Sequence, residues 1–102
     1  MSKFRYKNNR EESALFKKIK SYVRKRDCYT CQLCGKKTKY LHVHHIREWS
    51  DNVYLRYDKF NLISLDGECH RSIKGKEFSY IDQFMKKVFE NERKYNERNG
   101  NK

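Results

Sequence analysis

The spacing of the four cysteines constrains this chain more than any other feature of its sequence. Cys28, Cys31 and Cys34 lie within seven residues, and Cys69 directly precedes His70. Cysteines this close together bind a metal in a reducing compartment, whereas in an oxidising compartment they form disulfides. The chain has neither an apolar export segment after Met1 nor about 18 consecutive apolar residues that would span a membrane. We therefore expect a cytoplasmic protein whose cysteines bind a metal, with disulfides as the alternative.

Length and composition indicate that the fold needs a bound metal or disulfides for its stability. The chain has 102 residues, of which 36% are hydrophobic and 37% are charged. A domain of this size buries little apolar surface, so a metal site would supply part of its stability. Aromatic residues make up 15% of the chain, which argues against disorder. The sequence thus predicts one small domain over residues 1–102, held together by a metal or by disulfides.

The charge favours a polyanionic partner. The formal net charge is +12, and such an excess favours nucleic acid first and an acidic membrane surface second. Residues 1–30 hold ten basic and three acidic residues, whereas residues 31–70 hold six and five. A nearly neutral centre flanked by basic arms fits a central site with ends that grip a phosphate backbone. The alternative is a basic surface without a dedicated partner.

Periodicity predicts mixed α and β elements. Apolar residues recur at helical spacing over residues 15–23 and again over residues 79–95. Asn9 or Ser13 would cap the first of these helices, and Ser79 with Asp82 would cap the second. Between the helices we expect a cysteine knuckle (28–40), a strand (40–46), a loop (47–60), a strand (61–65) and a short helix (67–73). The domain then divides into a basic N-terminal helix (1–27), a core (28–75) and a C-terminal helix with a polar tail (76–102).

Three histidines and an asparagine end or begin these central elements. His44 and His45 end the first strand, Asn61 opens the second, and His70 lies on the short helix. Imidazoles from two elements, His44 and His70, can hold a divalent cation and leave coordination positions open. His45 would then act as a general base, and Asn61 could bridge backbone groups across the loop. Because strand neighbours face opposite sides, His44 and His45 share a site only if the strand ends or twists there. His42 lies on the face of His44, and we expect it to pack or contact phosphate.

Four segments carry a family resemblance. They are Arg26-Asp27-Cys28-Tyr29-Thr30-Cys31-Gln32-Leu33-Cys34-Gly35, Leu41-His42-Val43-His44-His45-Ile46, Asn61-Leu62 and Leu65-Asp66-Gly67-Glu68-Cys69-His70. In this order and spacing they resemble the HNH endonucleases, particularly small phage-encoded ones. The resemblance implies an α+β fold with the ββα-metal motif. It also implies that His45 is the base, that His44 and His70 bind Mg²⁺, Mn²⁺, Ni²⁺ or Co²⁺, and that Asn61 orders the loop. The implied reaction hydrolyses DNA to 5′-phosphate and 3′-hydroxyl ends.

The structural zinc site departs from the family pattern at one position. Cys31, Cys34 and Cys69 match the pattern, but Asp66 stands where a cysteine belongs. A carboxylate can complete tetrahedral zinc, and Cys28 could supply a thiolate instead. Asp66 is also well placed to cap the short helix. We take Asp66 as the fourth ligand, with Cys28 as the alternative.

Six basic residues are candidates for phosphate contact. Lys17, Lys18 and Lys20 lie on the N-terminal helix, and Arg47, Arg56 and Lys59 lie in the loop between the strands. As solvated side chains they would have no such role. We predict a metal-dependent HNH endonuclease that acts on double-stranded DNA with low sequence specificity. The alternatives are a non-catalytic zinc-stapled DNA-binding module and an accessory nuclease of phage DNA packaging that works beside a partner such as terminase. A phage-encoded protein would act in the host cytoplasm.

Overall fold

Five regular elements make up the fold in this computed structural model, which describes residues 13–48 and 53–100. They are the helix α2 (Ala14–Arg26), the strands β1 (His42–His45) and β2 (Leu62–Leu65), the short helix α3 (Gly67–Ser72) and the long helix α4 (Ile81–Arg98). Three 3₁₀ turns connect them: η1 (Val53–Arg56), η2 (Lys59–Asn61) and η3 (Glu77–Tyr80). The order helix, strand, strand, helix, helix is the expected one, and the class is α+β. Among the described helices, none is both long and apolar enough to cross a membrane.

The helix α2 begins where the sequence predicts. The Ser13 hydroxyl accepts a hydrogen bond from the Phe16 amide at 3.0 Å, as a capping serine does. Asn9, the alternative cap, lies outside the described residues. Arg24, Lys25 and Arg26 occupy the last turn, where the helix dipole favours positive charge.

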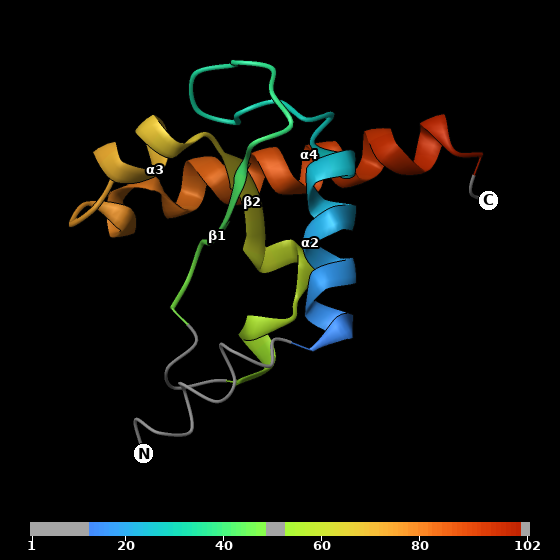
Figure 1. Cartoon of the computed structure of the whole chain (residues 1–102), viewed down its shortest axis with the longest axis horizontal. Coiled ribbons are helices and arrows are strands. Elements are labelled where there is room, and N and C mark those ends of the chain that lie inside the picture. Colours follow the sequence, from blue (N-terminus) through green and yellow to red (C-terminus); the bar gives the residue numbers. More distant parts are fainter. Residues whose placement is uncertain (1–12, 49–52, 101–102) are drawn as a thin grey trace.

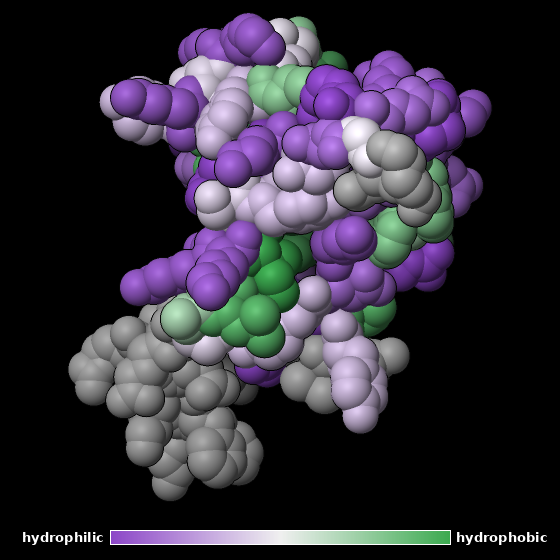
Figure 2. Space-filling model, turned by 90° about the vertical axis from the view of Figure 1, so that its right-hand side faces the viewer, coloured by the Kyte–Doolittle hydropathy of each residue, from purple (hydrophilic) through white to green (hydrophobic). Residues whose placement is uncertain are grey.

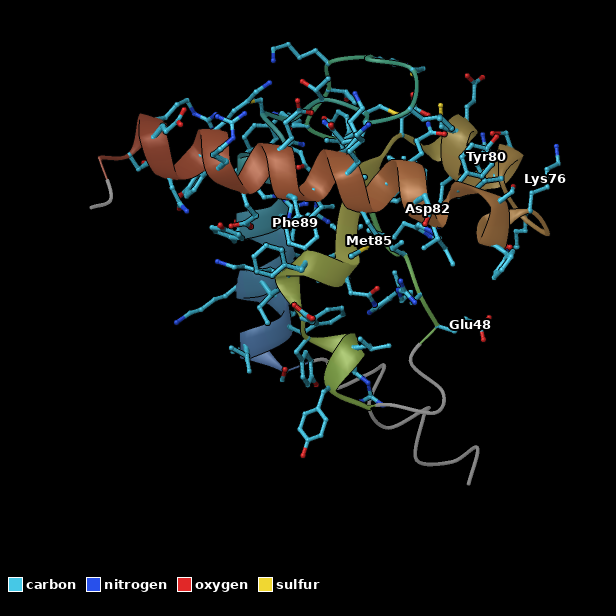
Figure 3. All side chains as sticks on the ribbon, turned by 180° about the vertical axis from the view of Figure 1, so that it is seen from behind. Glu48, Lys76, Tyr80, Asp82, Met85 and Phe89 are labelled. Atoms are coloured by element: carbon cyan, nitrogen blue, oxygen red, sulfur yellow. The ribbon has the colours of Figure 1, made fainter. Side chains whose placement is uncertain are left out.

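The helix α4 differs from its prediction at its start and on its buried face. Ser79 does not cap it, because its hydroxyl donates to the Lys76 carbonyl within the turn η3. The buried face consists of Phe84, Val88 and Glu92, spaced by four residues. Phe89, expected on the apolar face, is 56% exposed. In Figure 3, Phe89 and Met85 project from α4 to the side on which α2 and the strands lie.

The two strands form an antiparallel pair that brings the histidines beside the core. His42 pairs with Leu65, His44 with Ile63 and His45 with Leu62. All four residues of β2 are buried, so this strand forms the centre of the fold. Figure 1 shows α4 running across the molecule behind the sheet, with α2 on one side of the strands and α3 on the other. The ββα unit is therefore enclosed by the two longer helices.

A buried ionic network joins the end of α2 to both ends of β2. The Arg26 guanidinium, 1% exposed, donates to the Asp27 carboxylate at 2.9 Å and to the Glu92 carboxylate at 3.3 Å. It also donates to the carbonyls of Lys59 at 2.9 Å and Leu62 at 2.7 Å. The Asp27 carboxylate in turn accepts from the Ser64 amide at 3.0 Å. Because the two carbonyls flank Asn61, this network also holds the end of the loop between the strands.

Candidate metal centres and nuclease site

Three thiols and one carboxylate converge where the knuckle meets the start of α3. One candidate ligand atom from each of Cys31, Cys34, Asp66 and Cys69 lies within 4.8 Å of the others. The knuckle is closed by hydrogen bonds from the Cys31 amide to the Lys36 carbonyl (2.8 Å) and from the Gly35 amide to the Cys31 carbonyl (2.9 Å). The sequence permits this turn because Gly35 has a φ of +84°, which favours glycine. The cluster could hold a metal ion, and its three sulfurs are the donors that zinc prefers.

Asp66 caps the helix and belongs to the cluster at the same time. Its Oδ1 atom accepts from the Cys69 amide at 2.7 Å, while its Oδ2 atom accepts from the Cys34 thiol at 3.1 Å. The sequence suggested capping and ligation as competing roles, but a carboxylate has two oxygens and uses one for each contact. Cys28 lies outside the cluster; its side chain is exposed and its carbonyl accepts from the Lys37 ammonium at 3.0 Å.

The four side chains of the cluster differ in how their surroundings shift their pKa values. Burial opposes ionisation of Cys31, but backbone N–H groups directed at its sulfur outweigh burial and lower its pKa. The Asp66 carboxylate raises the pKa of the Cys34 thiol, and burial raises that of the Cys69 thiol. The Cys69 amide, followed by the Cys34 thiol, lowers the pKa of Asp66. A cation at this point would therefore meet a carboxylate and a readily ionised thiol.

His44 and His70 form a second group of potential ligands. Their ring centroids lie 5.2 Å apart, and the His44 ring also contacts Phe84. His44 is 8% exposed, and burial, together with the neighbouring His70, lowers its pKa to about 4. Its Nε2 atom is buried and has no hydrogen-bond partner among the described residues. A buried polar atom without a partner needs an explanation, and a nitrogen that binds a cation beside His70 provides one.

His45 faces different surroundings from His44, as strand alternation predicts. Its Nε2 atom lies 3.1 Å from the Arg56 carbonyl, and its ring stacks on Phe16 of α2 with centroids 5.9 Å apart. A carbonyl only accepts, so Nε2 carries the proton and the lone pair of the neutral ring lies on Nδ1. Burial lowers the pKa of His45, although the bond to the Arg56 carbonyl opposes this effect. Near neutral pH the ring is therefore a base in a defined tautomer.

Asn61 closes the loop between the strands. It is buried, and its Oδ1 atom accepts from the Arg47 amide at 2.9 Å. Its Nδ2 atom donates to the carbonyls of Arg47 at 3.0 Å and Leu55 at 3.1 Å. These three bonds join the two ends of the loop and place η1, which holds the Arg56 carbonyl, beside His45.

The candidate DNA-contacting residues have different surroundings. Lys17 and Lys18 on α2 and Arg47 after β1 are exposed. Lys20 is half-buried, with its ammonium over the Phe16 ring at 5.1 Å. Figure 2, which views the molecule from the side of α2, shows hydrophilic residues over most of that face, with a hydrophobic area near its centre and smaller ones toward its top and right-hand edge.

Arg56 and Lys59 both contact neighbouring side chains, although Lys59 is itself exposed. The Arg56 guanidinium is half-buried and lies 5.9 Å from the centroid of the Tyr57 ring. The Lys59 ammonium lies 3.3 Å from the Glu92 carboxylate and 5.1 Å from the centroid of the Tyr22 ring. Because Glu92 offsets its charge, Lys59 is a weaker candidate for phosphate contact than its place in the loop suggested.

Sequence reasoning missed two contacts to the histidines. Nothing in the sequence indicates that the ring of Phe16 packs on His45. His42 was expected to pack or contact phosphate, yet its Nδ1 atom lies 3.0 Å from the Nδ1 atom of His70. The alternation of β1, which places His42 on the face of His44, was the available signal.

The fold and these two clusters are those of a ββα-metal domain, in which two short antiparallel strands and a helix carry histidines beside a thiol-rich cluster that could hold a metal ion. Residues 31–76 match the family model described as HNH endonuclease, so this part of the chain is similar to an HNH domain. No curated protein and no solved structure matches the chain.

Proposed function

We propose that this protein is a metal-dependent endonuclease that hydrolyses phosphodiester bonds of double-stranded DNA. The observation that carries the proposal is the buried Nε2 atom of His44 beside His70, which has no hydrogen-bond partner in the described part of the chain. It lies next to the end of β1, where His45 is placed to act as a base. A DNA-binding module stapled by zinc would need only the cysteine cluster and the basic surface. It has no use for this arrangement of histidines.

His45 supplies the base. Its Nδ1 lone pair takes a proton from a water molecule, and the resulting hydroxide attacks phosphorus in line with the 3′ oxygen. The bond from phosphorus to the 3′ oxygen breaks, and this oxygen takes a proton from water, which leaves a 5′-phosphate and a 3′-hydroxyl. The imidazolium of His45 then returns its proton to solvent. The Arg56 carbonyl, 3.1 Å from Nε2, holds the ring in this tautomer and stabilises the imidazolium that forms. Asn61 maintains the loop that presents this carbonyl.

His44 and His70 would hold the catalytic divalent cation. Such a cation supplies Lewis-acid stabilisation of the charge that develops on the phosphate and the leaving oxygen. Imidazole ligands favour Mn²⁺, Co²⁺ or Ni²⁺ over Mg²⁺. Cys31, Cys34, Asp66 and Cys69 would hold structural zinc, which stabilises the fold and does not take part in the reaction.

Exposed basic residues would grip the DNA backbone. The α2 lysine pair, Lys17 and Lys18, and Arg47 have exposed side chains on elements next to His45. Contacts to phosphates carry no sequence information, so we propose low sequence specificity. Cooperation with a phage packaging protein such as terminase, and action in the host cytoplasm, stay predictions.

Plasmid cleavage tests the proposal. Zinc-loaded protein is incubated with supercoiled plasmid in Mg²⁺, Mn²⁺, Ni²⁺, Co²⁺ or EDTA. We expect nicked or linear DNA with a divalent cation and intact DNA in EDTA. His45→Ala should lose cleavage but keep its zinc content and its affinity for DNA, because the base acts in the transition state. DNA binding without cleavage in every metal would favour the non-catalytic module, and full activity of His45→Ala would refute the assigned base.

A further inference from the structure

His42 contacts one of the proposed metal ligands directly. It shares a face of β1 with His44, two residues away, and it pairs with Leu65 across the sheet. The His70 ring lies edge-on between the two, with its centroid 5.2 Å from each of their ring centroids. The Nδ1 atoms of His42 and His70 are 3.0 Å apart, which is a hydrogen-bond distance.

We propose that His42 is a positioning residue for the catalytic metal site. His42 accepts a hydrogen bond from the Nδ1–H group of His70, and this bond directs the Nε2 lone pair of His70 toward the cation. The inference rests on the proposed function, because it takes His44 and His70 as the ligands. It gives His42 a different role from the packing or phosphate contact that the sequence suggested.

The protonation of the two rings leads to this assignment. A neutral imidazole has one N–H group and one lone pair, so two facing Nδ1 atoms attract only when one donates and the other accepts. If His70 donates, its lone pair lies on Nε2, away from His42. If His42 donates, the lone pair of His70 points at His42 and its Nε2 carries a proton that blocks a cation. Histidines that bind metals usually donate their other N–H group to a fixed acceptor.

The other edge of the exposed His42 ring faces the start of α3. The ring lies over the first residue of α3, where a Cβ atom added to Gly67 would be 3.6 Å from Nε2 of His42. The same point would be 3.4 Å from the Arg71 guanidinium. The Nε2 edge of His42 therefore faces the start of α3, while its Nδ1 edge faces His70.

Two measurements on the zinc-loaded full chain test the proposal. The first is a long-range ¹H–¹⁵N NMR spectrum, recorded without added divalent cation, that reads the tautomer of each histidine. We expect His70 to carry its proton on Nδ1 in the wild type. We also expect this preference to be lost in His42→Ala and restored in His42→Gln, whose side-chain carbonyl can accept the same hydrogen bond. A proton on Nε2 of His70 in the wild type would overturn the proposal.

The second measurement is calorimetric titration with Ni²⁺. We expect His42→Ala to weaken binding about 10–100-fold, the usual effect of removing a partner of a metal-binding histidine. His42→Gln should recover most of this loss, and Lys39→Ala, an exposed residue shortly before β1, should bind like the wild type. Wild-type affinity in His42→Ala, or a loss in His42→Gln as large as in His42→Ala, would overturn the positioning role. Wild-type affinity in His44→Ala and His70→Ala would instead refute the metal site of the proposed function.

Discussion

Replacing Arg26 with methionine tests whether the buried ionic network stabilises the folded domain. Methionine fills a similar volume but leaves two carboxylates, Asp27 and Glu92, without the cation between them. Removing one partner of a buried ion pair costs about 3–5 kcal/mol. The carbonyls of Lys59 and Leu62 also lose a donor, and each buried acceptor left unpaired costs about 1–3 kcal/mol. These terms overlap, so we expect a loss of at least about 4 kcal/mol in the free energy of unfolding.

Urea unfolding at a fixed free zinc concentration measures this loss, because zinc binding itself contributes to stability. The matched control is Arg93→Met. Arg93 pairs with Glu97 at 3.2 Å on the same helix, but both side chains are more than half exposed. An exposed pair at this spacing contributes about 0.3–0.5 kcal/mol. For a domain of this size, each kcal/mol lowers the Tm by about 4–8 °C. Arg26→Met should therefore melt well below both the wild type and the control.

A double variant distinguishes the network from simple loss of packing. Glu92→Gln removes one of the carboxylates that Arg26 neutralises. If the two side chains interact, the free-energy loss in Arg26→Met with Glu92→Gln is smaller than the sum of the two single losses. Additive losses, or an Arg26→Met variant as stable as Arg93→Met, would refute the reasoning.

Three further predictions concern the zinc centre, the base and the DNA grip. Asp66→Asn keeps an oxygen that can cap α3 but loses the carboxylate, so its zinc affinity in a chelator competition should fall. Cys28→Ser should bind zinc like the wild type, and equal affinities of the two variants would exclude Asp66 as a ligand. Burial, together with the positive charge of Lys20, lowers the pKa of His45. Because the proposed cleavage needs the neutral ring, Lys20→Met should raise this pKa and shift the acid limb of the pH–rate profile to higher pH. An acid limb at the wild-type pH would contradict this. Replacing the α2 lysine pair with glutamine should flatten the salt dependence of DNA affinity without changing the sequences cut, because affinity rests on counterion release from phosphates. An unchanged slope of affinity against salt concentration would show that this pair does not touch DNA.

Short-range patterns predicted most of the candidate site. The spacing of Cys31 and Cys34 lets one turn bring both thiols together, and the order of strand, loop, strand and helix brings Asp66 and Cys69 to them. The position of Asn61 at the end of the loop likewise predicted its bonds across that loop. In each case the contact depends on residues that are close in sequence or joined by one hairpin.

Two side chains have contacts that the local pattern did not indicate, one at the start of α4 and one in the loop between the strands. Ser79 fits a capping pattern, but the chain enters α4 through a 3₁₀ turn and uses its hydroxyl there. The phosphate contact predicted for Lys59 stays a prediction, and the structure adds that its ammonium pairs with Glu92 of α4. Local sequence cannot distinguish an exposed lysine from one whose counter-ion lies on a distant helix.

The sequence by itself determined the class of the fold, the order of its elements and the groups of residues that form the cysteine cluster and the histidine site. These features depend on spacing, on side-chain periodicity and on the donor chemistry of cysteine, histidine and aspartate. Only the tertiary structure decided that Arg26 is buried, because its partners Lys59, Leu62 and Glu92 lie 33 to 66 residues away. It alone also set the orientation of His70 against His42, because that contact depends on how α3 packs on β1. Burial and ring orientation follow from the packing of whole elements, which no local pattern records.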